Sequence, residues 1–258
     1  MKGVILAGGT GSRLMPLTAV ANKNLLPVYD RPMLFYPIKT MVDAGVRDLL
    51  IITGGDRTGD LLRVLGDGSA LGIHRLYFAV QPRPMGIAHA IGLAESFADG
   101  DHLFVMLGDN LVFNADIARS AATFDRCAFG AKVFLKAVPD PERFGVAEMR
   151  KGNVISIEEK PETPKSNLAV TGLYMYDHTV FEKIRRLQPS ARNELEVTEL
   201  NKAYLREGTL RAEILNGDWI DAGTFESLFT ASEMARRQVL KQAEAETESS
   251  LKMEAVAA

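Results

Sequence analysis

Short apolar runs alternate with helical stretches along the first 125 residues. The apolar runs are typical of buried strands, and glycine or proline follows each of them closely. They are Gly3–Ala7, Asp48–Thr53, Arg75–Val80 and His102–Leu107. Helices are predicted between them at Met33–Ala44, Arg57–Leu65 and about Ile87–Phe97, with Pro32 opening the first helix and Gly45 following its last turn. This alternation predicts an α/β fold with a doubly wound, Rossmann-like, mostly parallel central sheet and helices on both faces.

The pattern changes after residue 125, where strands follow one another without long helices between them. The expected strands are Cys127–Lys136, Gly145–Glu148, Val154–Glu159, Val170–Tyr176 and Thr209–Leu215, and the expected helices are Thr179–Leu187, Glu196–Glu207 and the segment from Phe225 onward. This predicts a smaller mixed or antiparallel portion joined to the first half. We expect a single domain over residues 1–237, with halves at about 1–125 and 126–237, and a polar tail over residues 238–258 that is helical or disordered.

A glycine-rich loop follows the first strand. Gly8, Gly9 and Gly11 let the backbone turn sharply and approach a ligand with no Cβ in the way. A helix starting near Ser12 would direct free N–H groups and a positive dipole end at an anion, and Arg13 adds a cation with a forked set of donors. The strand, the glycine turn and the cation together indicate a phosphate-binding loop.

This loop matches neither of the two common phosphate-binding motifs. No G-x-x-x-x-G-K-[ST] run is present, so it is not a Walker A loop. Gly9 and Gly11 supply the first two glycines of the dinucleotide fingerprint G-x-G-x-x-G, but Leu14 stands at the third position. An ordinary strand-to-helix turn therefore stays open as an interpretation of the loop taken alone.

Further polar residues stand in loops that follow predicted strands. The loop Gln81–Gly86 contains two prolines, and Asp109 comes directly after a buried strand with carboxylate oxygens that suit Mg²⁺. Lys23 and Asp221 lie in two other loops. Each has a structural alternative, namely a surface lysine, a plain turn or, for Asp221, a helix N-cap network.

Composition excludes several classes of function. Of the 258 residues 47% are hydrophobic and 24% are charged, as in a globular domain, and the net charge of −3 argues against nucleic-acid binding. Cys127 is the single cysteine, which excludes an internal disulfide and a multi-cysteine zinc site and fits a reducing cytoplasm. No apolar stretch approaches the roughly 18 residues of a membrane span, and early glycines interrupt any signal-peptide pattern. We expect a cytoplasmic protein that binds neither membrane nor nucleic acid.

Taken together, the loops resemble the signature of the sugar nucleotidyltransferases, and most of all that of the bacterial glucose-1-phosphate thymidylyltransferases. The matching segments are Gly8-Gly-Thr-Gly-Ser-Arg13-Leu, Lys23-x-Leu-Leu-Pro-Val28, Gln81-Pro-x-Pro-x-Gly86, Leu107-Gly-Asp109-Asn110, Arg143-Phe-Gly145-Val, Glu159-Lys160-Pro161, Thr171-Gly-Leu-Tyr174 and Asp221-Ala-Gly-Thr224. They extend over nearly all of residues 1–230. The resemblance implies a Mg²⁺-dependent enzyme that condenses dTTP with glucose 1-phosphate to give dTDP-glucose and pyrophosphate.

The resemblance also implies roles for individual residues. In the nucleotide-binding half, the nucleotide would contact Leu6, Gly8, Gly9, Thr10, Gly11, Ser12, Arg13, Gln81, Gly86 and Asp109. In the sugar-binding half, the sugar phosphate would contact Gly145, Glu159, Lys160 and Val170. Arg13, Lys23 and Lys160 would be the catalytic residues that stabilise charge, and Asp109 and Asp221 would hold Mg²⁺.

The sequence departs from the pattern of that family at a few places. Asn22 stands before Lys23 where serine is usual, and Met85 and His89 occupy base-loop positions where Asp and Gln are frequent. We interpret His89 as a residue that covers a helix face. The familiar enzymes also carry a longer C-terminal helical portion, in whose place this chain has the polar tail. We therefore expect a homodimer or a monomer rather than a tetramer.

Three other functions share parts of the pattern. A uridylyltransferase that makes UDP-glucose or another sugar nucleotide would use the same mechanism with UTP. A glycosyltransferase would also place acidic metal ligands at a strand end, but it would lack the combination of Arg13 and Lys23. A catalytically silent regulatory or binding subunit typically loses the loop arginine, the lysine or the metal carboxylates, and all of them are present here.

Overall fold

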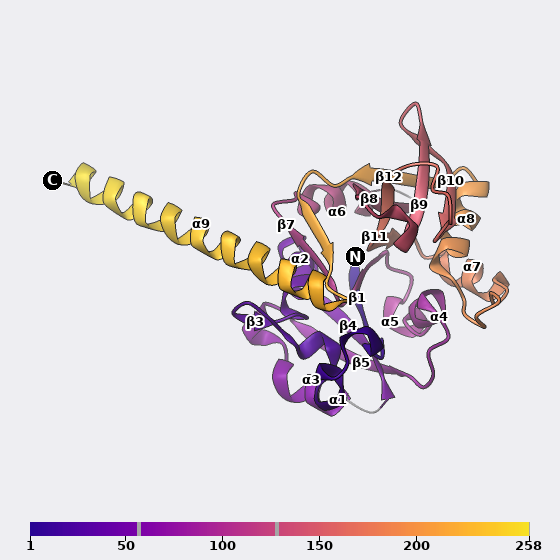
Figure 1. Cartoon of the computed structure of the whole chain (residues 1–258), viewed down its shortest axis with the longest axis horizontal. Helices are drawn as coiled ribbons and strands as arrows, with labels where there is room; N and C mark the ends of the chain where they lie inside the picture. Colours follow the sequence, from indigo (N-terminus) through magenta and orange to yellow (C-terminus); the bar gives the residue numbers. More distant parts are fainter. Residues whose placement is uncertain (56–57, 127–128, 258) are drawn as a thin grey trace.

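The computed structural model describes residues 1–55, 58–126 and 129–257. Two predicted element starts, that of a helix at Arg57 and that of a strand at Cys127, lie outside these described residues. Figure 1 shows a body of strands and helices from which one long helix, α9 (Phe225–Ala257), projects. Within the described ranges, no helix combines the length and the apolar character that crossing a bilayer requires.

Nine strands of the described chain form one mixed sheet, in which a path of seven has the order β10-β9-β11-β6-β1-β4-β5 and β8 joins β11 to β12. The strands are β1 (Lys2–Ala7), β4 (Asp48–Gly54), β5 (Arg75–Gln81), β6 (Leu103–Leu107), β8 (Ala131–Ala137), β9 (Gly145–Arg150), β10 (Asn153–Glu159), β11 (Leu168–Tyr176) and β12 (Leu210–Ile214). β1 is parallel to β4 and β6, and β4 is parallel to β5. β11 is antiparallel to β6 and β8. The predicted parallel portion and mixed portion are confirmed, and both belong to the same sheet.

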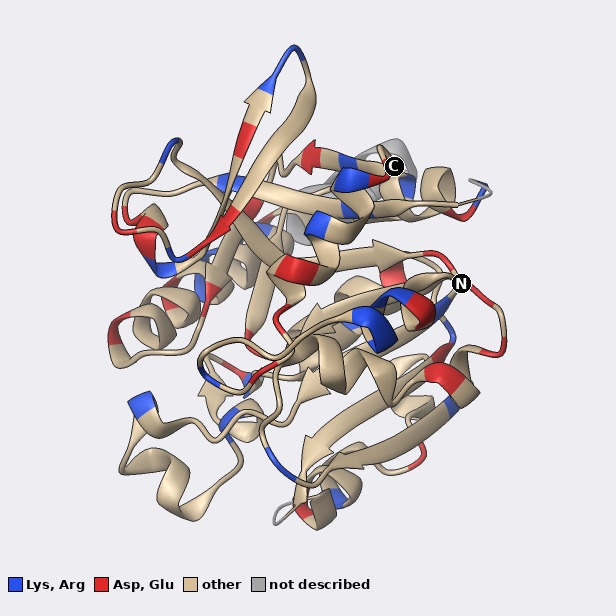
Figure 2. Cartoon of the chain, turned by 90° about the vertical axis from the view of Figure 1, so that its right-hand side faces the viewer, with Lys and Arg blue, Asp and Glu red and all other residues tan. Residues whose placement is uncertain are grey.

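Helices cover both faces of this sheet. One face carries α2 (Phe35–Asp43), α3 (Thr58–Leu65) and α6 (Ile117–Asp125), and the other carries α4 (Ile87–Gly92), α5 (Glu95–Ala98), α7 (Val180–Arg186) and α8 (Val197–Arg206). Successive side chains of a strand point to opposite faces, so Val4 packs in one core cluster and Ile5 in the other, both fully buried. Figure 2 shows the charged residues mainly on helices, loops and outer strands around the centre of the sheet.

A separate two-stranded sheet brings the C-terminal part of the chain against the N-terminal half. β13 (Asp218–Asp221) pairs antiparallel with β7 (Asn110–Phe113), and Asp221 lies opposite Asn110. The first turns of α9 pack on this pair through buried Ala231 and Ala235. The sequence pattern predicted neither strand, because each has only four residues and lies beside a turn signal.

The start of α2 differs from the prediction. Pro32 does not open the helix: it lies in β3 (Arg31–Pro32), which pairs with β2 (Pro27–Val28) in a small hairpin. The helix begins at Phe35. Gly45 does follow the last turn, with a left-handed φ of 89°, as expected for a glycine after a helix.

One predicted helix is divided in the structure, and another helix was not predicted. The helix expected over about Ile87–Phe97 is divided into α4 and α5, with Gly92 at the end of α4. Glycine lowers helix stability, which favours a break there. Helix α6 was not predicted. Short helical turns occupy loops at η1 (Ser12–Leu14), α1 (Leu17–Val20), η2 (Lys23–Leu25), η4 (Ser69–Leu71) and η5 (Pro141–Arg143).

The tail is helical, since α9 continues through Gln238 to Ala257. Of the two states expected for residues 238–258, the helical one is therefore observed for the described part. The division of the domain near residue 125 stays a prediction, although strands from both predicted halves contribute to the main sheet.

Candidate active site

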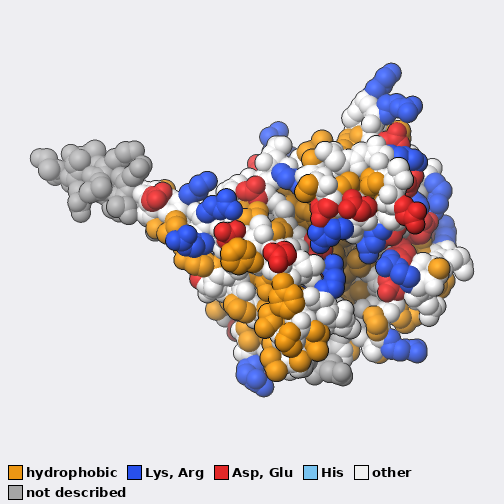
Figure 3. All heavy atoms as spheres, in the orientation of Figure 1, with side chains coloured by type: hydrophobic (Ala, Val, Ile, Leu, Met, Phe, Trp, Pro, Cys, Tyr) orange, Lys and Arg blue, Asp and Glu red, His pale blue; other side chains and the backbone are white. Residues whose placement is uncertain are grey.

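A cleft of about 670 Å³ opens at the carboxyl ends of β1, β5 and β6, where open α/β sheets bind ligands. Figure 3 shows a hollowed region beside the base of α9 with basic and acidic side chains around it. The lining includes nearly all residues with a predicted role: Leu6, Gly8, Gly9, Ser12, Arg13, Lys23, Gln81, Gly86, Asp109, Gly145, Glu159, Lys160, Val170 and Asp221. The predicted nucleotide, sugar and metal positions therefore meet in one cleft.

Thr10 and Gly11 are the predicted site residues that do not line this cleft. Gly11 has a φ of 68°, and a Cβ on it would come within 2.7 Å of Thr18 Cγ2. Packing and backbone conformation thus already require glycine at this position. A contact between the nucleotide and either residue stays a prediction.

The helix expected to start near Ser12 is wrong. The chain forms only the three-residue turn η1, and Met15 is then extended before Pro16. Proline disfavours a helical residue before it and cannot donate a hydrogen bond, so the helix does not continue. Because the helix dipole needs several aligned peptide units, the positive charge of this loop comes mainly from Arg13.

Arg13 and Asp221 both lie against Gly223. A Cβ on Gly223 would lie 2.6 Å from Asp221 Oδ1 and 2.7 Å from Arg13 Nη2. Such distances are too short for real contacts, so only glycine leaves room for these two side chains as they lie. The structure thus gives a reason for the glycine in the segment Asp221-Ala-Gly-Thr224.

Lys23 reaches across the cleft to Asp109. Its Nζ lies 2.5 Å from Asp109 Oδ2, and the two side chains are only 13% and 11% exposed. Asn22 supports this position, because its side-chain oxygen accepts a hydrogen bond from the Asn24 N–H and caps η2. Serine and asparagine cap equally well, so the departure at position 22 is conservative. The alternative reading of Lys23 as a solvated surface lysine is wrong.

Asn110 links Asp109 to strand β13, which carries Asp221. Its Nδ2 donates to Asp109 Oδ1 at 3.1 Å, and its Oδ1 accepts from Trp219 Nε1 at 2.7 Å. The backbone N–H of Ala222 donates to the Asp109 carbonyl oxygen at 2.8 Å. Asp109 and Asp221 are therefore positioned together by the β7–β13 pair and its side chains.

The two carboxyl groups experience different electrostatic surroundings. Burial acts to raise the pKa of Asp109, but the charge and hydrogen bond of the Lys23 ammonium bring it below its ordinary value. Burial raises the pKa of Asp221, and the Asp109 carboxylate adds to this, to about 6, against the opposing charges of Lys23 and Arg13. Asp109 thus has a direct cationic partner, whereas at Asp221 burial and the Asp109 charge outweigh the effect of Lys23 and Arg13.

The surroundings of Asp221 fit a cation. Its Oδ1 is buried and has no hydrogen-bond partner among the described residues, and an unsatisfied buried oxygen costs free energy. In the described part of the chain, no cluster of three or more His, Cys, Asp or Glu could hold a metal ion by itself. Mg²⁺ is usually bound by one or two carboxylates together with substrate phosphates. Asp109 and Asp221 fit that mode of binding.

Glu159 is at the centre of the polar groups on the side of the cleft that is predicted to bind the sugar. Its Oε2 accepts a hydrogen bond from Thr198 Oγ1 at 2.6 Å. Its Oε1 lies 3.7 Å from Lys160 Nζ and 3.6 Å from Arg192 Nη2. A carboxylate acceptor with two adjacent cations can bind both hydroxyl groups and a phosphate.

The loop Gln81–Gly86, which is predicted to contact the base, is fixed against Leu195. Gly86 has φ 94° and ψ 165°, and a Cβ on it would lie 2.4 Å from the Leu195 carbonyl oxygen. The Leu195 N–H donates to the Met85 carbonyl oxygen, and the Leu195 carbonyl accepts from Ala88. The loop is thus held by backbone hydrogen bonds that leave no space for a side chain at position 86.

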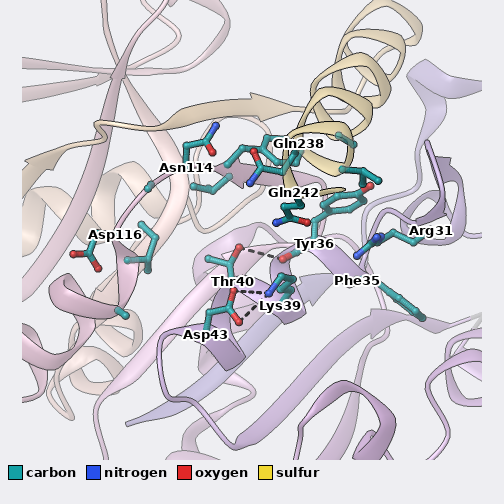
Figure 4. A pocket seen from close by; sticks show the side chains of 17 residues that line it. Arg31, Phe35, Tyr36, Lys39, Thr40, Asp43, Asn114, Asp116, Gln238 and Gln242 are labelled. Carbon is teal, nitrogen blue, oxygen red and sulfur yellow. Dashed lines mark hydrogen bonds and ion pairs between the residues drawn. The ribbon is translucent and has the colours of Figure 1, made fainter. Parts of the chain in front are cut away.

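A second cavity, of about 270 Å³, lies between α2, the start of α6 and α9. Figure 4 shows Gln238 and Gln242 of α9 near Tyr36 of α2, with Lys39 paired to Asp43. None of the predicted site residues lines it. Because its lysine is already paired within the helix, we assign it no part in the chemistry.

Comparison with known proteins identifies the family. The family model described as nucleotidyl transferase matches residues 2–238. The chain belongs to the nucleotidyl transferase family. The match includes the glycine-rich loop and the segment that contains Asp221, so both ends of the cleft lie within it. The predicted class of enzyme is confirmed.

Two similar curated relatives of this nucleotidyl transferase have the same name. Glucose-1-phosphate thymidylyltransferase from Neisseria meningitidis serogroup A / serotype 4A is 46% identical over 235 residues, which are 90% of this chain and 81% of that protein. The enzyme of the same name from Actinoplanes sp. is 48% identical over 239 residues, 92% of this chain and 78% of that protein.

Solved structures agree with this placement. A Bacillus anthracis protein provisionally named a glucose-1-phosphate thymidylyltransferase, in complex with a sucrose, is 47% identical with a TM-score of 0.87, covering 92% of this chain and 95% of that one. A UDP-glucose pyrophosphorylase complexed with UDP-glucose is 23% identical with a TM-score of 0.81, covering 92% of this chain and 98% of that one. The second shares the fold.

Several residues of the nucleotidyl transferase cleft received no role from the sequence. Asn110, Thr198, Trp219 and Arg192 all line it. Asn110 directly follows Asp109, and this adjacency was a usable signal. Thr198 and Arg192 carried no comparable signal. They lie in or just before α8, and only tertiary packing brings that helix to the cleft.

Proposed function

We propose that this nucleotidyl transferase condenses dTTP with glucose 1-phosphate to give dTDP-glucose and pyrophosphate. The shared name of the curated relatives supports this choice of substrates. One observation carries the proposal. Arg13 and Lys23, which lie in the short helical turns after β1, line the same cleft as the acids Asp109 and Asp221, which are distant in sequence.

The reaction requires charge stabilisation more than proton transfer. An oxygen of the sugar phosphate attacks the α-phosphorus in line, the bond from that phosphorus to the bridging oxygen breaks, and pyrophosphate leaves with the electron pair. A phosphate monoester has a second pKa of about 6, so the nucleophile is largely ionised near pH 7 without a general base. Arg13 and Lys23 stabilise charge on the triphosphate, and Lys160 stabilises charge on the sugar phosphate.

Asp109 and Asp221 are the proposed ligands of Mg²⁺. When bound, the ion neutralises and polarises phosphate oxygens. The unpaired Asp221 Oδ1 supplies a buried acceptor, while Asn110 and Lys23 fix the orientation of Asp109. Other residues that line the cleft are assigned to the base and the sugar. The base would contact Gln81 and Gly86, and the sugar would contact Gly145, Glu159 and Val170. A cytoplasmic location and a homodimer stay predictions.

Pyrophosphate release tests the proposed function. The purified chain is expected to release pyrophosphate from dTTP only when glucose 1-phosphate and Mg²⁺ are both present. The measurement uses a panel of dTTP, UTP, dCTP and dATP with several sugar 1-phosphates. A preference for UTP would favour the uridylyltransferase alternative. Sugar transfer without pyrophosphate release would favour a glycosyltransferase, and no turnover with any pair would contradict an enzymatic function.

The metal assignment predicts the behaviour of two amide variants. Asp109→Asn and Asp221→Asn are each expected to raise the Mg²⁺ concentration for half-maximal turnover by about tenfold or more, because a neutral amide is a weaker ligand than a carboxylate. A Mg²⁺ titration of the turnover rate measures this.

An exposed acid supplies the control for that titration. Asp60 pairs with Arg63 on the surface of α3, with side chains 39% and 80% exposed. Asp60→Asn should leave the Mg²⁺ titration unchanged. If Asp109→Asn and Asp221→Asn also leave it unchanged, they are not ligands of the metal.

A further inference from the structure

His89 contacts the glutamine to which base recognition is assigned, so its interpretation as a residue that only covers a helix face is wrong. His89 Nδ1 lies 2.9 Å from Gln81 Nε2. Gln81 lines the cleft and is 9% exposed, whereas His89, in α4, is not among the lining residues. His89 is therefore placed to affect a bound nucleotide through Gln81 and not by direct contact.

The partners of Gln81 Nε2 determine which end of its amide faces the cleft. Nε2 also lies 3.2 Å from the carbonyl oxygen of Gly86, which can only accept a hydrogen bond. An amide NH₂ has two donors, so one serves Gly86 and the other serves His89 Nδ1. Nδ1 accepts only when the imidazole is neutral and carries its proton on Nε2. A reversed amide would bring two acceptors, Gln81 Oε1 and the Gly86 oxygen, into contact.

The oxygen of Gln81 lies beside the glycine-rich loop. A Cβ built on Gly8, which lines the cleft, would lie 3.5 Å from Gln81 Oε1. An amide oxygen accepts hydrogen bonds, so it pairs with an N–H on the edge of a base. Thymine and uracil both present the N3–H donor, whereas N3 of cytosine is itself an acceptor. An acceptor fixed at this position therefore selects thymine or uracil against cytosine.

We infer that His89 is a positioning residue that sets the base selectivity of the nucleotide site by holding the Gln81 amide with its oxygen toward the cleft. The inference rests on the proposed function, because it takes the cleft to be a nucleotide site. It specifies the class of base as a pyrimidine with a hydrogen on N3, whether or not position 5 carries a methyl group.

A matched pair of variants tests this role. His89→Leu removes the acceptor, whereas His89→Asn keeps an acceptor oxygen close to the position of Nδ1. Calorimetry with Mg²⁺ and no sugar phosphate gives the dissociation constants of dTTP and dCTP, and pyrophosphate release gives kcat and KM.

In His89→Leu one amide N–H still serves the Gly86 carbonyl oxygen. The second N–H loses its acceptor, so a rotation of the amide can present that N–H to N3 of cytosine. We expect its preference for dTTP over dCTP to fall by about tenfold or more, because a site built around a hydrogen bond discriminates strongly against the wrong partner. Its kcat with saturating dTTP should change by less than about threefold. His89→Asn should keep the preference within about threefold of that of the parent.

The outcomes separate this inference from the proposed function. An unchanged dTTP-to-dCTP binding ratio in a folded His89→Leu variant would overturn the role of His89 even if the parent releases pyrophosphate from dTTP. Equal weakening of both nucleotides, with no rescue by His89→Asn, would also overturn it, because that result indicates a structural role. A parent without turnover would contradict the proposed function, and the binding ratio would still decide the role of His89.

Discussion

Lys23→Ala is expected to lower kcat by about 10²–10³-fold, the range for the loss of one preorganised group that stabilises transition-state charge. Lys23 is the cation closest to Asp109, at 2.5 Å, and both side chains are nearly buried. In the proposed reaction, its removal takes positive charge away from the place where the pyrophosphate leaving group gains negative charge. Initial rates of pyrophosphate release at saturating dTTP and glucose 1-phosphate measure the change.

Two controls accompany Lys23→Ala. Lys39 forms an exposed pair with Asp43 on α2, with both side chains about 60% exposed, so Lys39→Ala should retain the parent rate. Circular dichroism should show that Lys23→Ala has the secondary structure of the parent, since β1, β4 and β6 do not depend on η2 for their pairing. A kcat within twofold of the parent value would show that Lys23 does not stabilise the reacting phosphates.

Gly86→Ala is expected to have the largest effect on folding stability. The backbone of Gly86 has φ 94° and ψ 165°, a region that only glycine adopts readily, which costs another residue about 1–3 kcal/mol. The new Cβ would also lie 2.4 Å from the Leu195 carbonyl oxygen, and overpacking of this kind costs about 1–3 kcal/mol more. Urea unfolding followed by circular dichroism should therefore show a loss of about 2–6 kcal/mol.

Gly152→Ala isolates the steric part of this effect. Gly152 has a φ of 83°, but a Cβ on it would lie within 4 Å of no atom of the residues that the structure describes. Its replacement should cost about 1–2 kcal/mol, the backbone contribution alone. Equal losses for Gly86→Ala and Gly152→Ala would mean that the contact with Leu195 relaxes without cost.

The alternation of strands and helices was sufficient to predict the architecture of the first half. Val4 and Ile5 are adjacent and both fully buried, which is what a central parallel strand with helices on both faces produces. The short elements were harder. β7 and β13 have four residues each, and their pairing depends on tertiary contacts that a local pattern does not contain.

The glycines and charged residues of the cleft were predictable because few residue types can bind phosphate groups or a metal ion. Arg13, Lys23 and Asp109 were all singled out by position, since each stands in a loop after or between strands. The direct pairing of Lys23 with Asp109 was not predicted, because the two residues are 86 positions apart. The contact of His89 with Gln81 was missed because a single histidine on a helix carries no signal of its orientation.

The β7–β13 ladder has a consequence for how the enzyme matures. Trp219 and Asn110, whose hydrogen bond joins the two strands, are 109 positions apart, so the second acid of the proposed metal site reaches the cleft late in synthesis. A nascent chain arrested before Asp218 would hold the glycine loop, Lys23 and Asp109 but could not yet gather Mg²⁺ between two carboxylates.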